Sequence, residues 1–89
     1  MRDYYKLGDE SKVPIPCTFD EWIDRDAKRI CATVDRIAGI EVITIFYGEG
    51  PLPFQSMIFG GEHDLRQWKY LTWYEAEEGH KVACEVAGL

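Results

Sequence analysis

The chain has 89 residues, of which 46% are apolar and 13% aromatic, and its formal net charge is −6. This composition is typical of one small globular domain, and we expect residues 1–89 to fold as a single unit without metal or disulfide staples. The excess of acidic side chains disfavours direct binding to nucleic acid, because affinity for phosphates comes mainly from Lys and Arg. The longest apolar runs are too short to cross a bilayer, and the charged N-terminus does not resemble a signal peptide.

The N-terminal segment predicts a short strand around residues 3–7, followed by a turn at Gly8–Asp9. Pro14 and Pro16 restrict the next stretch to an edge strand or a loop, since proline lacks the N–H that a central strand donates.

The segment CTFDEWIDRDAKRI predicts a helix that continues to Ile30. Thr18 and Glu21 have the spacing of a capping box, in which each side chain bonds the other residue's free backbone N–H. Apolar residues then recur at helical spacing. These residues are Phe19, Trp22, Ile23, Ala27 and Ile30.

The next segment, which begins at Ile30, changes to the β-branched composition of strands. Arg36 to Gly39 supplies a turn, so this segment predicts a hairpin. Its second strand, Ile40 to Tyr47, is apolar on both faces, which indicates a central strand covered on at least one side.

Two further strands and a closing helix complete the predicted elements. FQSMIFG and WKYLT read as strands, and the stretch IFGGEHDL between them reads as a strand end, a glycine turn and a charged hairpin tip. Thr72 and Glu75 repeat the capping box in front of the helix. Gly79 within that helix is expected to allow close packing against the sheet. Together these elements predict an α+β domain of two layers, a mainly antiparallel sheet of four to five strands with both helices packed on one face.

Three widely spaced cysteines, Cys17, Cys31 and Cys84, have apolar neighbours and form no CxxC pair. We expect reduced, buried thiols in a reducing compartment.

Catalysis is not expected, because the chain has no nucleophile elbow and no phosphate loop. Exposed Trp and Tyr side chains anchor protein interfaces, so the aromatic run WKYLTWY and the glutamates after it predict a protein-binding surface. The alternative is that helix and sheet simply cover these aromatics. The predicted interface consists of Trp68, Tyr70, Trp73, Tyr74, Glu75, Glu77 and Glu78.

The glycine loop offers a second group of candidates, in which backbone or cationic groups hold the phosphate of a nucleotide that stacks on aromatic rings. These residues are Gly60, Gly61, His63, Arg66 and Lys69. A metal site built on His63 and His80 is a further alternative. Neither a metal nor a cofactor is expected, and the ordinary interpretation is a solvated hairpin loop.

The stretch from Phe54 to His80, FQSMIFGG…RQWKYLTWYEAEEGH, resembles a signature of small proteins encoded by tailed bacteriophages and prophages. The pattern of that family is similar to F-E-T-M-x-F-G-G, a short loop, and W-x-Y-x-T-W-x-E-A-x-x-G-H. The VITIFYG strand and the Tyr-rich start followed by Pro-Cys also fit. Gln55 and Ser56 depart from the family's Glu-Thr, and the segment between IFYG and PLPF is shorter. The resemblance implies a phage protein in the host bacterial cytoplasm and assigns no catalytic residue.

The leading hypothesis is a non-enzymatic phage accessory protein that binds a host protein stoichiometrically and inhibits an antiviral defence. Its acidic face would occupy a basic surface on the partner. The alternatives are an oligomer that sequesters a small nucleotide signal and a minor virion component.

Overall fold

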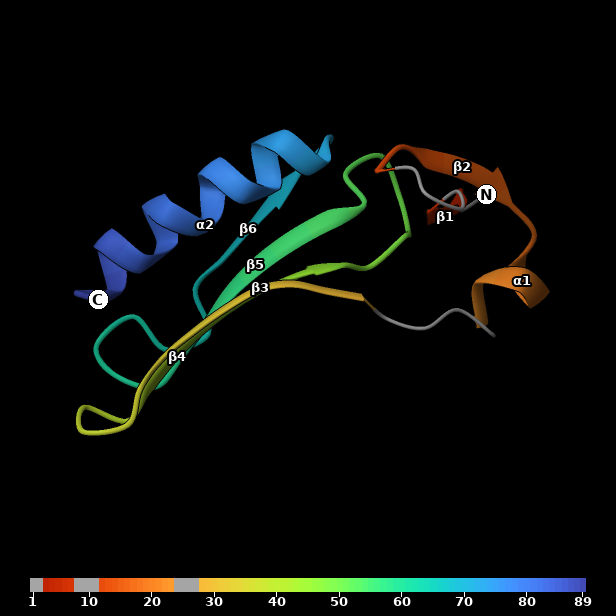
Figure 1. Ribbon diagram of the computed structural model, residues 1–89. Coiled ribbons are helices and arrows are strands. Elements are labelled where there is room, and N and C mark those ends of the chain that lie inside the picture. Colours follow the sequence, from red (N-terminus) through yellow and green to blue (C-terminus); the bar gives the residue numbers. More distant parts are fainter. Residues whose placement is uncertain (1–2, 8–11, 24–27) are drawn as a thin grey trace.

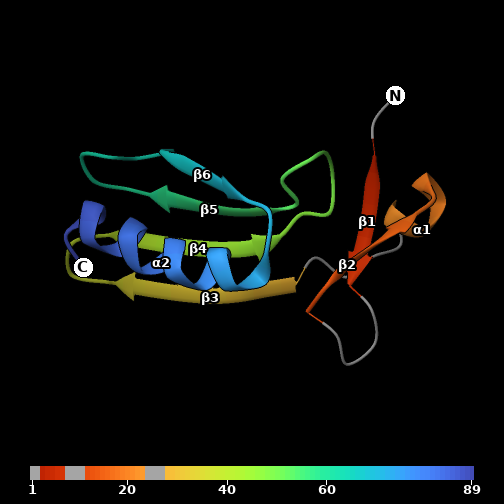
Figure 2. The same ribbon diagram turned by 90° about the horizontal axis from the view of Figure 1, so that it is seen from above.

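The computed structural model describes residues 3–7, 12–23 and 28–89, and its main body is a four-stranded antiparallel sheet. The strands pair in chain order as a meander, and Figure 2 shows them side by side under one long helix. They are β3 (Lys28–Asp35), β4 (Ile40–Phe46), β5 (Phe54–Phe59) and β6 (Gln67–Tyr70).

The turn between β3 and β4 is built by the side chain of Asp35. Its Oδ1 accepts hydrogen bonds from the backbone N–H groups of Ile37 and Ala38, both at 3.0 Å. Gly39 closes the turn with φ 70°, a left-handed conformation that glycine adopts without steric penalty. The predicted hairpin turn from Arg36 to Gly39 is confirmed.

Helix α2 (Trp73–Ala87) covers one face of the sheet. It starts at Thr72, whose hydroxyl accepts the Glu75 N–H at 3.1 Å, and it ends at Gly88 with φ 83°. The cap at Thr72 was expected from the sequence, whereas the end at Gly88 was not predicted. The residues that α2 buries against the sheet are Ala76, His80 and Ala83, and two of these are small, which lets the helix approach the strands closely.

The core lies between α2 and the sheet, in two clusters. One consists of Val42, Ile58 and Ala83. The other consists of Phe46, Phe54 and Ala76. Burial of each large apolar side chain contributes about 1.5–3 kcal/mol, so these residues hold the helix on the sheet.

The N-terminal residues form a small unit beyond one end of the sheet (Figure 1), and its Tyr5 and Leu7 pack against the cluster of Phe46, Phe54 and Ala76. Its elements are β1 (Tyr4–Leu7), β2 (Pro14–Cys17) and α1 (Phe19–Ile23), and β1 and β2 make a two-stranded antiparallel sheet. The predicted capping box is confirmed, because the Glu21 N–H donates to Thr18 Oγ1 at 3.2 Å. The rings of Tyr4, Phe19 and Trp22 pack on one another with centroids 4.9–6.0 Å apart.

The α+β class and the four-stranded antiparallel sheet are therefore confirmed, but the predicted placement of the first helix is wrong. Of the two helices in the described residues, α2 alone packs against the four-stranded sheet. Helix α1 has five residues and buries none of them, so its aromatic side chains pack on β1 instead. Strand β1 pairs with β2 and makes a single bridge from Tyr4 to Glu49, so it adds no fifth strand to the meander.

The predicted helix also extended too far toward its C-terminus. Ile30 lies in β3 as the extra residue of a β-bulge between Arg29 and Cys31, and the β-branched Thr33 and Val34 that follow it pair with β4. The predicted turn at Gly8–Asp9 and the expected helical position of Ala27 lie outside the described residues. The three cysteines form no disulfide among the described residues, and each is half-buried rather than buried. Within the described ranges, no helix has the length and hydropathy that a membrane span requires.

Candidate functional site

The sheet has one face under α2 and a second face, called the outer face below, that points away from it. Side chains alternate along a strand, and directly paired residues share a face. On β4 and β5 the buried side chains are those under the helix. The outer face therefore holds three rows across the strands. They are Val34, Glu41 and Phe59; Ala32, Ile43, Met57 and Gln67; and Ile45, Gln55 and Lys69.

The outer face is rich in apolar side chains, although no described helix covers it (Figure 1). An antiparallel sheet with one solvated face usually alternates between apolar and polar residues. Here Val34 is 51% exposed and Phe59 41% exposed, and the centre is occupied by Ile43 and Met57. The apolar character that β4 has on both faces is therefore explained by α2 on one side only.

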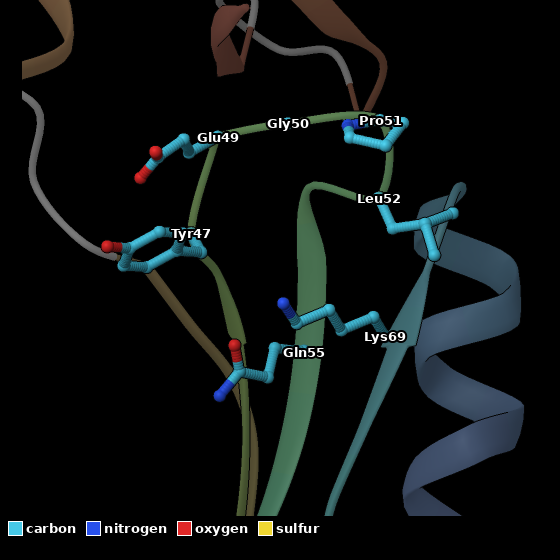
Figure 3. A pocket seen from close by; sticks show the side chains of 7 residues that line it. All are labelled: Tyr47, Glu49, Gly50, Pro51, Leu52, Gln55 and Lys69. Carbon is cyan, nitrogen blue, oxygen red and sulfur yellow. The ribbon is translucent and has the colours of Figure 1, made fainter. Parts of the chain in front are cut away.

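One end of the outer face opens into a hollow of about 630 Å³ (Figure 3). Its wall combines an aromatic ring, a carboxylate, an amide and an ammonium group with a Gly/Pro loop. The lining residues are Tyr47, Glu49, Gly50, Pro51, Leu52, Gln55 and Lys69.

The loop from Tyr47 to Pro53 shapes this hollow. The N–H groups of Tyr47 and Gly48 both donate to the Pro53 carbonyl, at 2.8 and 3.0 Å, which folds the loop back on itself. Gln55 at the start of β5 and Lys69 on β6 are paired neighbours, so both side chains reach the hollow from the sheet (Figure 3). No described carboxylate forms an ion pair with Lys69, which leaves its ammonium available to an anion.

The predicted aromatic interface is divided between the core and the surface. Trp68 packs against the cluster of Val42, Ile58 and Ala83, and Tyr70 and Trp73 pack against the other cluster. Tyr74 is 71% exposed on the free side of α2. Of the four aromatic residues, Tyr74 alone presents most of its surface to solvent.

The predicted glutamates lie on the exposed surface of α2 around Tyr74. Glu75 takes part in the helix cap with Thr72. Glu78 accepts from Lys81 at 3.1 Å, and Glu77 lies 4.0 Å from Lys12. Exposed pairs of this kind contribute roughly 0–1 kcal/mol, so the carboxylates can exchange these lysines for a partner's cations at little cost.

The glycine-loop candidates are not brought together with Lys69. Gly60 follows β5, and Lys69 pairs with Gln55, five residues away, which is about 17 Å along an antiparallel strand. The loop is closed by Asp64, whose Oδ1 accepts the Gly60 N–H at 2.6 Å. Arg66 lies over the Trp68 ring, 5.1 Å from its centroid.

A buried chain of polar side chains crosses the sheet under α2. His80 is 7% exposed, and its Nδ1 lies 2.7 Å from Thr44 Oγ1 and its Nε2 2.9 Å from Thr33 Oγ1. Thr44 Oγ1 also lies 2.5 Å from Ser56 Oγ. The Tyr70 hydroxyl lies further along; it is buried without a hydrogen-bond partner, and burial raises the pKa of this phenol.

The hydrogen bonds of His80 test the alternative of a metal site built on His63 and His80. Both His80 ring nitrogens contact threonine hydroxyls, so neither is directed at His63, which lies in the loop between β5 and β6. Among the described residues no group of three or more His, Cys, Asp and Glu side chains gathers around a common point. The geometry gives this alternative no support.

Sequence reasoning missed the polar chain and the hollow. Ser56 carried a signal, because it shares the buried face of β5 with Phe54 and Ile58, and a polar residue at such a position needs a partner. The hollow had no comparable signal, since its lining comes from a loop and two strands whose register the sequence does not state.

A comparison of the chain with protein-family models, curated proteins and solved structures finds no match.

Proposed function

We propose that this chain is a non-enzymatic phage accessory protein that binds a host protein stoichiometrically and thereby inhibits an antiviral defence. The observation that carries the binding role is Tyr74, which is 71% exposed among glutamates on the free side of α2. A tyrosine supplies a large, rigid contact area with little loss of entropy, so it is suited to anchor an interface. The phage setting rests on the sequence resemblance.

The charge of this surface indicates the kind of partner. Glu75, Glu77, Glu78 and Glu85 are all exposed on α2, and the whole chain has a net charge of −6. A basic host surface, such as one that otherwise binds nucleic acid, is its electrostatic complement. Such an interaction forms quickly at low ionic strength and weakens as salt screens the charges.

The experiment is affinity capture from a phage-infected host lysate with the tagged chain and its Tyr74→Ala variant. We expect a host protein at a fixed stoichiometry, with at least about tenfold weaker binding to the variant, the effect of losing an interface anchor. Leu65→Ala is the matched control, because Leu65 is 61% exposed in the loop between β5 and β6 and should leave capture unchanged. The proposal fails if no partner is recovered, or if phage infection of defence-carrying cells proceeds equally well without the chain.

The hollow on the outer face favours a second candidate, a small nucleotide ligand. Tyr47 offers a ring for stacking and Lys69 a cation for phosphate, although Glu49 in the same wall opposes an anion. Thermal-shift measurements with mono-, di- and cyclic nucleotides test this candidate. It requires a concentration-dependent rise in the midpoint that Lys69→Ala removes, and it is excluded if no nucleotide stabilises the chain.

A further inference from the structure

We propose that two copies of this chain pack their outer faces together as a weak two-fold dimer. The outer face is the large apolar surface of the described residues that neither helix covers (Figure 1). It lies on the side of the sheet opposite Tyr74, so the dimer leaves the surface of the proposed host interface free.

The first argument is the pattern of the side chains. Ile43 and Met57 occupy the middle of the face, and Ala32, Val34, Ile45 and Phe59 surround them. When the inner faces of two sheets pack about 10 Å apart, side chains of this kind interdigitate to form a core. A face that remained in water would be expected to carry polar residues at these central positions.

The second argument is the area. Four strands about 4.8 Å apart and six residues at about 3.3 Å each give roughly 19 by 20 Å, near 400 Å² in projection for each copy. The accessible area buried by the contact is larger than this projection, because the side chains protrude and the loops at the ends add to the contact. The total therefore approaches about 1,200 Å², the lower limit for a specific complex. An area near this limit is typical of a weak, reversible dimer rather than an obligate one.

The third argument is the distribution of charge, which selects the orientation. On the strands, the row with Val34 and Phe59 contains the carboxylate of Glu41, whereas the opposite row holds Gln55 and Lys69. Glu49 lies beyond that row, in the loop that lines the hollow. Arg36 lies in the adjoining turn, beyond the strands. A two-fold axis that runs across the strands places Glu41 of one copy over the Gln55 and Lys69 end of the other. An axis along the strands would instead stack the two Glu41 ends.

The ends of the two copies also fit in this orientation. The turn between β3 and β4 of one copy meets the end of the other that holds the hollow. Ile37 in that turn is fully exposed, and Leu52 and Pro51 offer apolar surface in the wall of the hollow. The contact would cover the most exposed apolar side chain of the turn.

Two valines make a matched test. Val34 on the outer face is 51% exposed and Val82 on the opposite side of the molecule is 50% exposed, so Lys at either position leaves the core intact. Sedimentation equilibrium across a concentration series should give the wild-type chain a mass that rises toward twice 10.3 kDa. We expect Val34→Lys to raise the dissociation constant at least tenfold and Val82→Lys to change it less than twofold.

Charge exchange tests the orientation. Glu41→Lys and Lys69→Glu should each weaken the dimer severalfold, and the double variant should restore it, because the pairing between copies is then re-formed with reversed signs. The proposal is overturned if the wild-type chain stays monomeric up to millimolar concentration, or if Val82→Lys weakens association as much as Val34→Lys. A double variant weaker than either single variant overturns the crossed two-fold arrangement.

Discussion

The His80 imidazole lies between hydroxyl groups of two neighbouring strands, Thr33 on β3 and Thr44 on β4. Burial lowers its pKa below the ordinary value of 6.5, so the ring is neutral in the folded protein at neutral pH. A neutral imidazole has one N–H and one acceptor nitrogen, and two hydroxyls match it in either tautomer. A proton on the ring would make both nitrogens donors and place a charge under α2, where little water reaches it.

We therefore predict that acidification below about pH 6.5 destabilises the fold before the carboxylates titrate. The unfolded chain binds the His80 proton more readily than the folded chain, so the free energy of unfolding falls as pH drops from about 6.5 toward the lower folded pKa. Above about pH 7 this histidine contributes no slope. Urea unfolding between about pH 5 and 7.5 measures the effect.

His63 provides the control for this prediction. His63→Gln should keep the pH dependence, whereas His80→Gln, which retains hydrogen-bonding groups, should remove most of it. An NMR titration of the wild-type chain gives the His80 pKa directly, without any variant. A value at or above 6.5 would contradict the account.

The contact between α2 and β6 depends on Gly79, which has the Tyr70 ring against it. A Cβ placed on Gly79 would overlap the ring carbons and the hydroxyl of Tyr70. The sequence-based expectation that this glycine permits close packing is confirmed. The helix accepts a residue that costs about 1 kcal/mol relative to Ala, because the close approach buries the Tyr70 ring.

Gly79→Ala is therefore predicted to destabilise the fold despite its better helix propensity. Overpacking of a well-filled contact costs about 1–3 kcal/mol, which exceeds the gain of about 1 kcal/mol from alanine. The sign should reverse in a Tyr70→Val background, where the ring is gone and only the propensity gain remains. Urea unfolding of the wild type, Gly79→Ala, Tyr70→Val and the double variant completes this double-mutant cycle. An equal loss of stability in both backgrounds would show that Tyr70 is not the cause.

The sequence predicted helix starts and turns correctly where these depend on residues within the same short segment. Thr18 and Thr72 both cap helices as expected, and Gly39 closes the expected turn. The end of the first helix was missed, since helical spacing near Ile30 competes with the pairing of β3 on β4, and that pairing is long-range. The secondary structure of a segment of β-branched residues is determined by its partner strand rather than by its own periodicity.

At the scale of the whole molecule, the sequence predicted that helix packs on sheet, but it did not predict which face of the sheet and which aromatic rings are exposed. The residues of β4 indicated two apolar faces, and only the structure shows that one of these faces lacks a helix. The aromatic run around Trp68 was assigned to an interface because its spacing does not reveal which rings α2 covers. The hollow likewise depends on how the loop that follows β4 folds over Gln55 and Lys69.

The joint between the N-terminal unit and the sheet depends on Gly48. The Tyr5 N–H donates to the Gly48 carbonyl at 2.7 Å, and a Cβ on Gly48 would lie 2.5 Å from the Tyr5 carbonyl oxygen. Gly48 also has φ 78°, in the left-handed region. Gly50 has φ 76° and its N–H donates to the Asp3 carbonyl at 2.9 Å, but a Cβ on it would have nothing within 4 Å, so it carries the same backbone penalty without the steric overlap.

We predict that Gly48→Ala separates the N-terminal unit from the sheet while the sheet and α2 stay folded. Both Gly48→Ala and Gly50→Ala pay the left-handed penalty of about 1–2 kcal/mol, but only the first also pushes against β1. Hydrogen exchange should therefore speed up at residues 4–7 in Gly48→Ala far more than in Gly50→Ala, with the amides of β4 and β5 unchanged. Equal exchange in the two variants would mean that backbone strain, and not the contact with Tyr5, sets the stability of the joint.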